Sequence, residues 1–121
     1  MMSKYHNQKV YYKGELFDSV GEYNRWRELL LLQKAGEITN LRRQVTFELI
    51  PAQYEPSTTD SKGRTRRGRL LERKCTYIAD FVYQSGSKSI VEDYKGVQTE
   101  VFKIKRKLML WRYGIEVRIT Q

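Results

Sequence analysis

The chain has 121 residues and a mass of 14.5 kDa, which fits one folded domain, residues 1–121, and leaves no room for a second hydrophobic core. Lysine and arginine number 23 against 14 acidic residues, and the resulting net charge of +9 favours a polyanionic partner, nucleic acid before an anionic membrane. One cysteine, Cys75, and one histidine, His6, argue against a disulfide framework, a zinc finger or a Cys–His dyad. A catalytic metal would therefore need oxygen ligands.

The apolar residues are too scattered for a membrane protein. The longest apolar run, residues 29–32, is far shorter than the roughly 20 residues of a membrane span. The polar N-terminus also lacks the apolar core of a secretory signal. We therefore expect no membrane association and a cytoplasmic location.

The first element expected is a helix over residues 20–35. Ser19 and Glu22 have the spacing of a capping box, and Phe17 stands where it can pack back on the first turn. Apolar residues then recur at three- and four-residue spacing, up to a stop at Gly36.

Alternating residues predict strands over residues 45–50, 76–83 and 88–95, with the last two joined as a hairpin by a tight turn at Gly86-Ser87. Thr99 caps a second expected helix that ends at Gly114, and alternation over residues 115–119 predicts a closing strand. The order helix, strand, hairpin, helix, strand predicts an α/β domain with a mixed central sheet. The second helix has one apolar and one basic face, made respectively by Val101, Ile104, Leu108 and Trp111 and by Lys103, Arg106 and Lys107.

Residues 54–74 are rich in turn-forming residues and predict a long, mobile loop. Between Lys62 and Lys74 there are seven basic residues against one acidic residue, Glu72. Such a segment suits electrostatic contact with phosphates, although a merely solvated surface loop is the alternative. The residues expected to contact DNA there are Lys62, Arg64, Arg66, Arg67 and Arg69, together with the basic face of the second helix.

The hairpin register makes a geometric prediction. If Gly86-Ser87 is the turn, Asp80 faces Asp93 and Ile78 faces Lys95. Two like charges placed opposite each other destabilise a sheet unless something compensates them. A divalent cation is the compensation we expect, because magnesium prefers one or two carboxylates with water and phosphate oxygens.

Asp80 and the run Asp93-Tyr94-Lys95 resemble the D…(D/E)-x-K pattern of the PD-(D/E)XK, or restriction-endonuclease-like, nucleases. The helix opening at residues 17–22 is similar to the first helix of these nucleases, which commonly contributes an acidic residue to the metal site. From about residue 11 to residue 119, the chain resembles small phage and prophage proteins of that superfamily. Ala79 replaces the usual proline, and strand alternation favours Asp93 over Glu92 as the second carboxylate.

The resemblance implies a restriction-endonuclease-like domain that acts as a magnesium-dependent DNA endonuclease. Asp80, Asp93 and the backbone carbonyl of Tyr94 would bind Mg²⁺, for which Mn²⁺ would substitute, and Glu22 would complete the shell directly or through water. Lys95 would orient the attacking water. The small domain offers little surface for reading sequence, which favours structure-selective cleavage, as at Holliday junctions or branches, or nicking. Symmetric cutting of both strands would require a homodimer.

Blander interpretations stay open beside this one. Glu22 alone would serve the capping box, and Asp80 would form a structural ion pair with Lys95. A non-catalytic nucleic-acid-binding protein with a nuclease-like fold is the main alternative function. A basic scaffold protein of a ribonucleoprotein or phage particle is a third.

Overall fold

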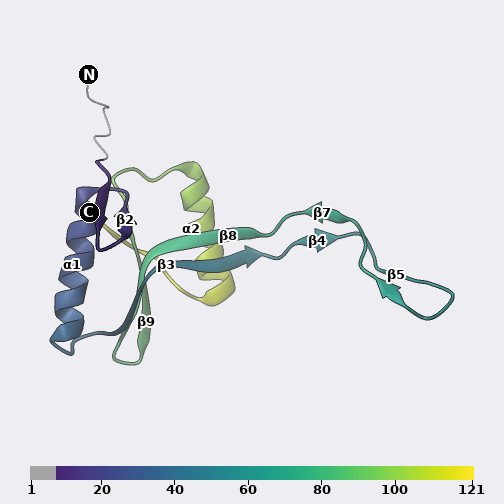
Figure 1. Ribbon diagram of the computed structural model, residues 1–121, viewed down its shortest axis with the longest axis horizontal. Helices are drawn as coiled ribbons and strands as arrows, with labels where there is room; N and C mark the ends of the chain where they lie inside the picture. Colours follow the sequence, from purple (N-terminus) through teal and green to yellow (C-terminus); the bar gives the residue numbers. More distant parts are fainter. Residues whose placement is uncertain (1–7) are drawn as a thin grey trace, which may run out of the picture.

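A four-stranded mixed sheet with the order β10-β9-β8-β3 forms the centre of the structure, a computed structural model that describes residues 8–121 (Figure 1). The antiparallel neighbours are β3 with β8 and β8 with β9, whereas β10 runs parallel to β9. The predicted mixed sheet flanked by helices is therefore confirmed. The strands are β3 (Thr39–Ile50), β8 (Cys75–Ser85), β9 (Lys88–Tyr94) and β10 (Arg118–Thr120).

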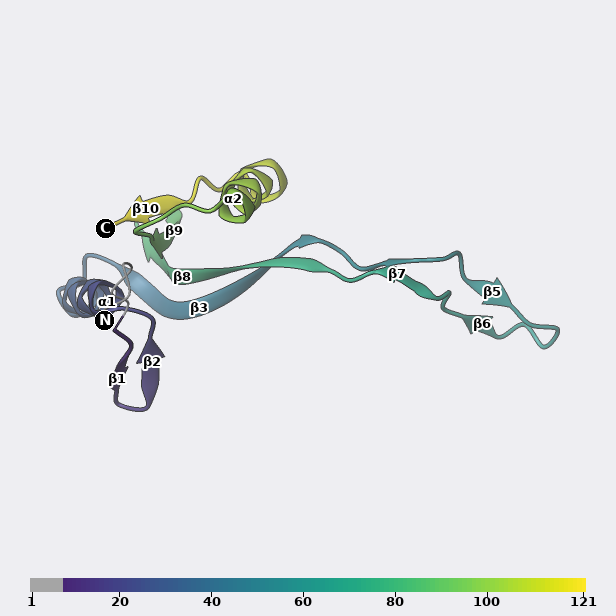
Figure 2. The same cartoon turned by 90° about the horizontal axis from the view of Figure 1, so that it is seen from above.

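Two helices cover opposite faces of this sheet, α1 (Val20–Lys34) and α2 (Glu100–Tyr113) (Figure 2). The backbone N–H of Glu22 donates to Ser19 Oγ, which confirms the predicted cap of α1. Within residues 8–121, neither helix has the length and apolar character needed to cross a membrane. A small hairpin that the sequence did not predict, β1 (Val10–Tyr12) with β2 (Glu15–Phe17), precedes α1.

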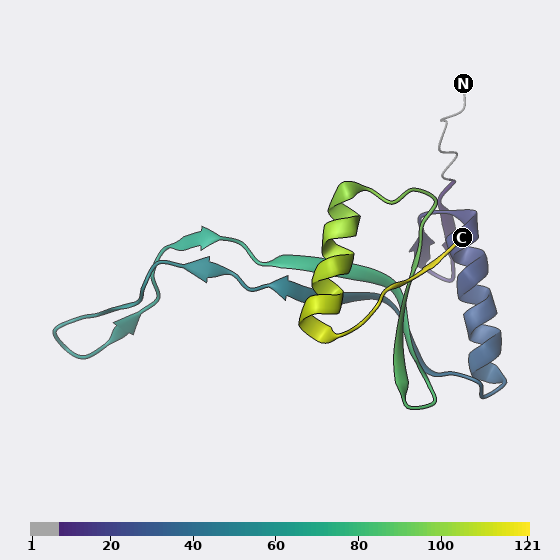
Figure 3. The same ribbon diagram turned by 180° about the vertical axis from the view of Figure 1, so that it is seen from behind.

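The apolar face predicted for α2 is wrong in three of its four residues, and only Leu108 packs against the core. Val101, Ile104 and Trp111 are exposed, and Trp111 retains 80% of its accessible surface. The helix instead buries Phe102 and Met109 against the sheet, two turns apart on one narrow stripe. Helix α2 lies across the sheet near the point where β3 and β8 leave it (Figure 3). It contacts the sheet along this one stripe of its surface.

The predicted hairpin register is confirmed in the body of β8 and β9. Ser85 pairs with Lys88 and Phe81 pairs with Glu92, as a turn at Gly86-Ser87 requires. The pairing predicted between Ile78 and Lys95 is wrong, because β9 ends at Tyr94 and the N–H of Lys95 donates to the Thr120 carbonyl. The parallel strand β10 therefore provides the hydrogen-bond partners at the end of β9, where β8 diverges from it.

Strand β8 changes the face that it presents at Asp80. Tyr77 and Ala79 pack in the cluster with α2, whereas Phe81 and Tyr83 pack in the cluster with α1. A regular strand would place all four on one side. The change occurs opposite Gln44 of β3, whose φ of 51° is rare outside glycine. Because of this bend, these alternate side chains of β8 pack on the α2 side before Asp80 and on the α1 side after it. Asp80 lies at the point where the side chains change sides.

The predicted irregular loop over residues 54–74 is wrong in form. The chain continues β3 and β8 into a long two-stranded projection, which we call the arm (Figure 2). Its strands pair in two short ladders, which give the backbone N–H and C=O groups hydrogen-bond partners across the ribbon. The arm contains β4 (Gln53–Tyr54), β5 (Thr58–Thr59), β6 (Thr65–Arg66) and β7 (Leu70–Glu72).

Candidate active site

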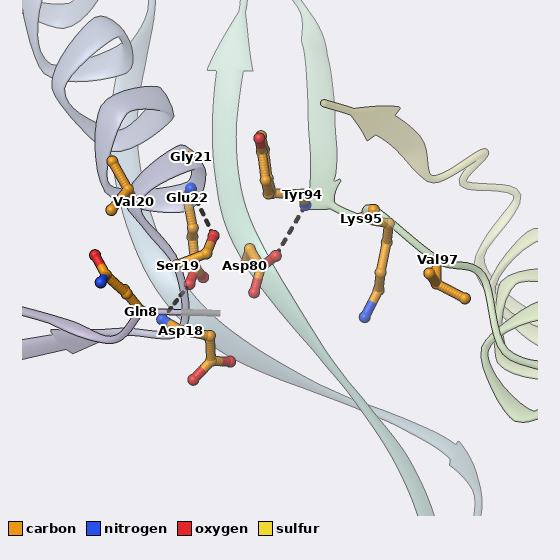
Figure 4. A pocket seen from close by; sticks show the side chains of 11 residues that line it. Gln8, Asp18, Ser19, Val20, Gly21, Glu22, Asp80, Tyr94, Lys95 and Val97 are labelled. Atoms are coloured by element: carbon orange, nitrogen blue, oxygen red, sulfur yellow. Dashed lines mark hydrogen bonds between the residues drawn. The ribbon is translucent and has the colours of Figure 1, made fainter. Parts of the chain in front are cut away.

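A cavity of about 510 Å³ opens between the first turn of α1, the middle of β8 and the end of β9. Figure 4 shows Glu22 entering it from α1, Asp80 from β8 and Lys95 from the segment after β9. Asp93 lies buried behind Asp80, with its side chain only 2% exposed. The structure therefore brings together the four side chains to which the sequence assigned catalysis.

Backbone hydrogen bonds fix the two aspartates against each other. The N–H of Asp80 donates to Asp93 Oδ1 over 3.3 Å, and the N–H of Tyr94 donates to Asp80 Oδ2 over 2.9 Å. Each strand thus holds the carboxylate of the other through its backbone. Asp93 Oδ2 is buried and accepts no hydrogen bond from the residues that the structure describes.

Both aspartates are electrostatically unfavourable as anions in this place. Burial, followed by the neighbouring Asp80 carboxylate, raises the pKa of Asp93 to about 7. Burial is also the largest cause of the raised pKa of Asp80, and Glu22 adds to it, whereas the hydrogen bond involving Asp93 lowers it. The site therefore favours a bound proton or a cation beside its carboxylates.

Lys95 supplies part of that compensation. Its Nζ lies 3.5 Å from Asp93 Oδ2 and 4.9 Å from the centre of the Phe102 ring. The ion pair foreseen as the bland alternative is formed with Asp93, not with Asp80. Although its predicted pairing with Ile78 is absent, Lys95 still lies beside the acidic pair because it directly follows β9.

Glu22 serves the cap of α1 and also lines the cavity, so its expected role as a metal ligand stays a prediction. Its backbone takes part in the helix cap, and Oε2 accepts from the N–H of Asp18 over 2.8 Å. Its other oxygen lies 3.5 Å from Gln44 Nε2, which also donates to Asp80 Oδ1 over 3.3 Å. The buried carboxylate therefore caps α1 and lines the cavity at the same time.

Glu92 is excluded from the site, as strand alternation predicted. It is fully buried on the α1 face, where Arg25 donates to both of its oxygens over 2.9 and 2.7 Å. The Tyr83 hydroxyl also donates to Glu92. This ion pair ties α1 to β9 and raises the pKa of Arg25, and it leaves Asp93 as the carboxylate on the cavity side.

Three residues around the site escaped the sequence analysis. Gln44 joins Glu22 to Asp80, and only its left-handed backbone, which no residue pattern signals, brings it there. Gly21 lets Tyr94 approach α1, since a Cβ at Gly21 would overlap the Tyr94 hydroxyl. The Tyr77 hydroxyl is buried without a hydrogen-bond partner among residues 8–121, and burial and Asp93 raise its pKa.

The donor set suits a hard divalent cation. All candidate ligands are oxygens, and the buried Asp93 Oδ2 accepts no hydrogen bond from the described residues and has the Lys95 ammonium 3.5 Å away as its nearest compensation. No group of three or more His, Cys, Asp or Glu side chains in residues 8–121 is arranged to hold a metal. A cation would therefore rest on the two aspartates, with the Tyr94 carbonyl, water and substrate oxygens completing its shell.

The predicted DNA-contacting residues fall into two groups. Those of residues 62–69 lie along the outer arm and are exposed. On α2, Lys103 pairs with Glu100 over 3.2 Å, Arg106 donates to Gln98 over 3.0 Å, and Lys107 is exposed. None of them lines the cavity, so any role in binding lies outside the acidic site.

Residues 2–121 match a family model described as a protein of unknown function, DUF1064. Neither a curated protein nor a solved structure matches the chain. The family model covers nearly the whole sequence, the acidic cavity and the arm included. The chain therefore belongs to the DUF1064 family.

Proposed function

We propose that this protein is a metal-dependent endonuclease that hydrolyses phosphodiester bonds in DNA. The observation that carries the proposal is that Glu22, Asp80 and Lys95 line one cavity, with Asp93 buried directly behind Asp80 and its Oδ2 3.5 Å from Lys95 Nζ. The element order of α1, β3, β8, β9, α2 and β10 is also the order that the nuclease resemblance implies.

Asp80 and Asp93 would hold Mg²⁺ or Mn²⁺ together with the Tyr94 carbonyl, and Glu22 would reach the shell directly or through water. The bound cation supplies two things, an acidified water and neutralisation of charge on the phosphate. Lys95 orients the attacking water and stabilises the charge that develops on the phosphoryl oxygens. Gln44 and the backbone N–H of Tyr94 hold Asp80 in the orientation that this arrangement needs.

The substrate follows from charge and size. The net charge of +9 favours a polyanion, and the exposed arginines of the arm suit sequence-independent phosphate contacts. One domain of 121 residues has little surface for base readout, which favours nicking or recognition of branched DNA, such as four-way junctions. Symmetric cutting would need a homodimer, which the molar mass in solution tests directly.

Incubation with supercoiled plasmid and with a four-way junction, in Mg²⁺, Mn²⁺ or EDTA, tests the proposal. We expect cleavage in both metals and none in EDTA. Asp80→Asn and Asp93→Asn should abolish it, whereas Glu37→Gln, which removes an exposed carboxylate beyond the end of α1, should not. Full activity of either aspartate variant, or equal cleavage in EDTA, would contradict the metal-dependent site.

The second candidate is a non-catalytic nucleic-acid-binding protein. It is favoured by the absence, within the described residues 8–121, of a cluster of three acidic, histidine or cysteine side chains arranged around a metal. It predicts DNA binding that is indifferent to Mg²⁺ and to both aspartate substitutions. Plasmid that stays intact in every metal, with tight salt-dependent binding, would select this candidate.

A further inference from the structure

The arm is stabilised by contacts of its own. At its tip, Asp60 Oδ1 accepts from the N–H groups of Lys62 and Arg64 over 2.9 Å each, and Oδ2 accepts from Arg64 Nε over 2.8 Å. Farther in, the Arg67 guanidinium stacks 4.5 Å from the centre of the Tyr54 ring. Gly68 permits a close crossing of the two strands, because a Cβ there would overlap the Glu55 carbonyl. These contacts shape a two-stranded ribbon and leave both of its faces open.

The charge on this ribbon is strongly one-sided. Residues 53–74 hold seven basic side chains against three acidic ones. Two of the acidic side chains are engaged at exposed ion pairs, Asp60 with Arg64 and Glu55 with Arg69. Lys62 and Arg66 form no ion pair with the described residues and are exposed. The outer arm therefore offers cationic groups that the protein itself does not neutralise.

The arm is continuous with the acidic cavity. Asp80 lies on β8, which directly follows β7 of the arm in the chain. The paired partner of β8, β3, likewise leads into β4 of the arm. Lys95 lines the acidic cavity and also a second one of about 300 Å³, whose walls include Thr76 and Ile78 at the root of the arm. A DNA backbone held at Lys95 would thus lie next to this second cavity, which borders β8 on the side of the arm.

We propose that the arm lies in the major groove of duplex DNA and follows it on one side of the phosphate that Lys95 and a cation on Asp80 and Asp93 would hold. This inference rests on the proposed nuclease function. A two-stranded β-ribbon fits the B-form major groove, which is about 12 Å wide, whereas the deep and narrow major groove of A-form RNA excludes it. The partner is therefore duplex DNA.

The length of the arm fixes its reach. At about 3.3 Å per residue, Arg73 and Arg66 lie at most about 23 and 46 Å along the chain from Asp80. At about 3.4 Å of axial rise per base pair, they would contact phosphates at most about 7 and 14 base pairs from the reacting one, because a ribbon that winds with the groove advances less along the axis than its own length. Duplex that ends sooner on that side would leave the outer arm without a partner.

Binding of blunt duplexes of increasing length, from about 8 to 24 base pairs, measures this reach. The assay is run in Ca²⁺, a hard cation that takes the same oxygen ligands, and gels check that the duplex stays intact, so that chemistry plays no part. The test variant is Lys62→Ala/Arg66→Ala, which removes two unpaired charges and spares the contacts that shape the arm. The matched control, Lys34→Ala/Lys88→Ala, removes two exposed charges at the end of α1 and the start of β9, away from the arm (Figure 1).

We expect the ratio of the variant to the wild-type Kd to be near one on the shortest duplex and to rise with length. On the longest duplex, the slope of log K against log salt should become shallower by about 1.8, which equals about a tenfold change between 50 and 200 mM salt. The control should change affinity equally at all lengths. Glucosylated 5-hydroxymethylcytosine, which fills the major groove, should remove the length-dependent gain, whereas the minor-groove ligand netropsin should not.

A ratio that does not depend on length would overturn the inference, as would loss of the gain with netropsin instead of glucosylated cytosine. Equal length-dependent gains on double-stranded RNA or single-stranded DNA would overturn it too. The proposed function fails separately. Length-dependent binding in Ca²⁺ with no cleavage in Mg²⁺ or Mn²⁺ would leave the arm in the groove and make the protein a binding module.

Discussion

Two carboxylates that repel each other lie side by side in β8 and β9, Asp93 buried and Asp80 half-buried, and a third from α1 faces the cavity that Asp80 lines. A stable fold carries such a cluster at a cost unless protons or cations compensate it. Lys95 compensates only in part, because its Nζ lies 3.5 Å from one oxygen of Asp93 and pairs with neither Asp80 nor Glu22 among the described residues. The negative charge that Lys95 leaves uncompensated should affect the stability of the fold. The site can therefore be tested by unfolding experiments, without an assay of catalysis.

Asp80→Asn and Asp93→Asn are expected to separate chemistry from folding. Each variant should lose at least about a hundredfold in cleavage rate, since several kcal/mol of charge stabilisation depend on the cation ligands. The metal-free variants should be as stable as the wild type or more stable, because the repulsion is removed while the shape is kept. Thermal unfolding in EDTA measures this, and a clear drop in Tm would show that the carboxylates are structural.

The stability of the metal-free protein should depend on pH through Asp93. Its pKa is raised to about 7 by burial and by Asp80, above an unfolded value of about 3.9, so the folded state holds the proton more tightly. This contribution is fully present below the unfolded pKa and is lost as the pH rises through about 7. Tm in EDTA should therefore fall between pH values of about 5 and 8.

Asp93→Asn should flatten that dependence, and Mg²⁺ should raise the wild-type Tm most at the upper end of the range. A Tm of the metal-free wild type that rises over the same interval would contradict the assignment. The same readouts identify the cation site even if no substrate is cut.

Glu22→Gln distinguishes the two roles of this side chain. Glutamine still accepts from the N–H of Asp18 and still fills the cap, so Tm should change little. If Glu22 contributes charge to the metal shell, the cleavage rate should fall by about tenfold or more and the Mg²⁺ requirement should rise. Unchanged kinetics over a Mg²⁺ titration would assign Glu22 to the helix cap alone.

The sequence located most of the site because strand and cap rules operate at short range. The two-residue turn at Gly86-Ser87 sets which residues of β8 and β9 lie side by side, and the cap at Ser19 places Glu22 in the first turn of α1. Gln44 was beyond reach. Its position depends on a left-handed backbone opposite Asp80, a tertiary feature that the local residues do not signal.

The close packing of α1 on β9 is a link between elements that the sequence also missed. Gly21 has no side chain, and the ring of Tyr94 occupies the space that a Cβ would need. Tyr94 lies between Asp93 and Lys95 in the chain, so the packing of its ring against Gly21 also orients these two neighbours. The first turn of α1 and the end of β9 are therefore held together where the cavity lies between them.

Gly21→Ala should destabilise the fold by about 1–3 kcal/mol through overpacking. The better helix propensity of alanine offsets up to about 1 kcal/mol of this loss. Cleavage should fall further than the loss of stability explains, because Lys95 and Asp93 move with Tyr94. Gly96→Ala is the matched control, since a Cβ there meets nothing within 4 Å. Chemical denaturation and cleavage assays measure the two effects, and a Gly21→Ala protein as stable as this control would show that Tyr94 moves aside freely.

The elements that the sequence mispredicted share a cause. Helical periodicity identified an apolar stripe on α2, but the sheet accepted Phe102 and Met109 instead and left Val101, Ile104 and Trp111 in solvent. Polar composition identified residues 54–74 as a loop, but cross-strand hydrogen bonds continue there without an apolar face. In both places tertiary geometry decides between faces or pairings that the local pattern leaves equivalent.

The whole molecule combines a packed domain with a ribbon that shares none of its core. A two-stranded ribbon without a third strand or a helix against it is marginally stable in water. The arm therefore opens locally at a small fraction of the free energy that unfolds the domain, even though its strands are paired. Bound duplex would favour the paired form, which connects the stability of the arm to DNA binding.

Limited digestion with trypsin should accordingly cut the free protein first within residues 62–74, where the arginines and lysines of the open ribbon are accessible. The domain should survive as two fragments held together, because β3 and β8 remain paired in the central sheet. A duplex of about 20 base pairs should slow these cuts at low salt and lose that protection at high salt, since the contacts are to phosphates.

Asp60→Ala provides the internal comparison. It removes the acceptor of three hydrogen bonds that close the tip, so cutting at Lys62 and Arg64 should accelerate while the Tm of the domain stays the same. The carboxylate is ionised when it accepts these bonds, as its lowered pKa indicates, so acidification should loosen the tip in the wild type alone. First cuts in α2 or β9 would show that the arm does not open on its own. Cuts in the arm that duplex does not slow would show that it does not meet DNA.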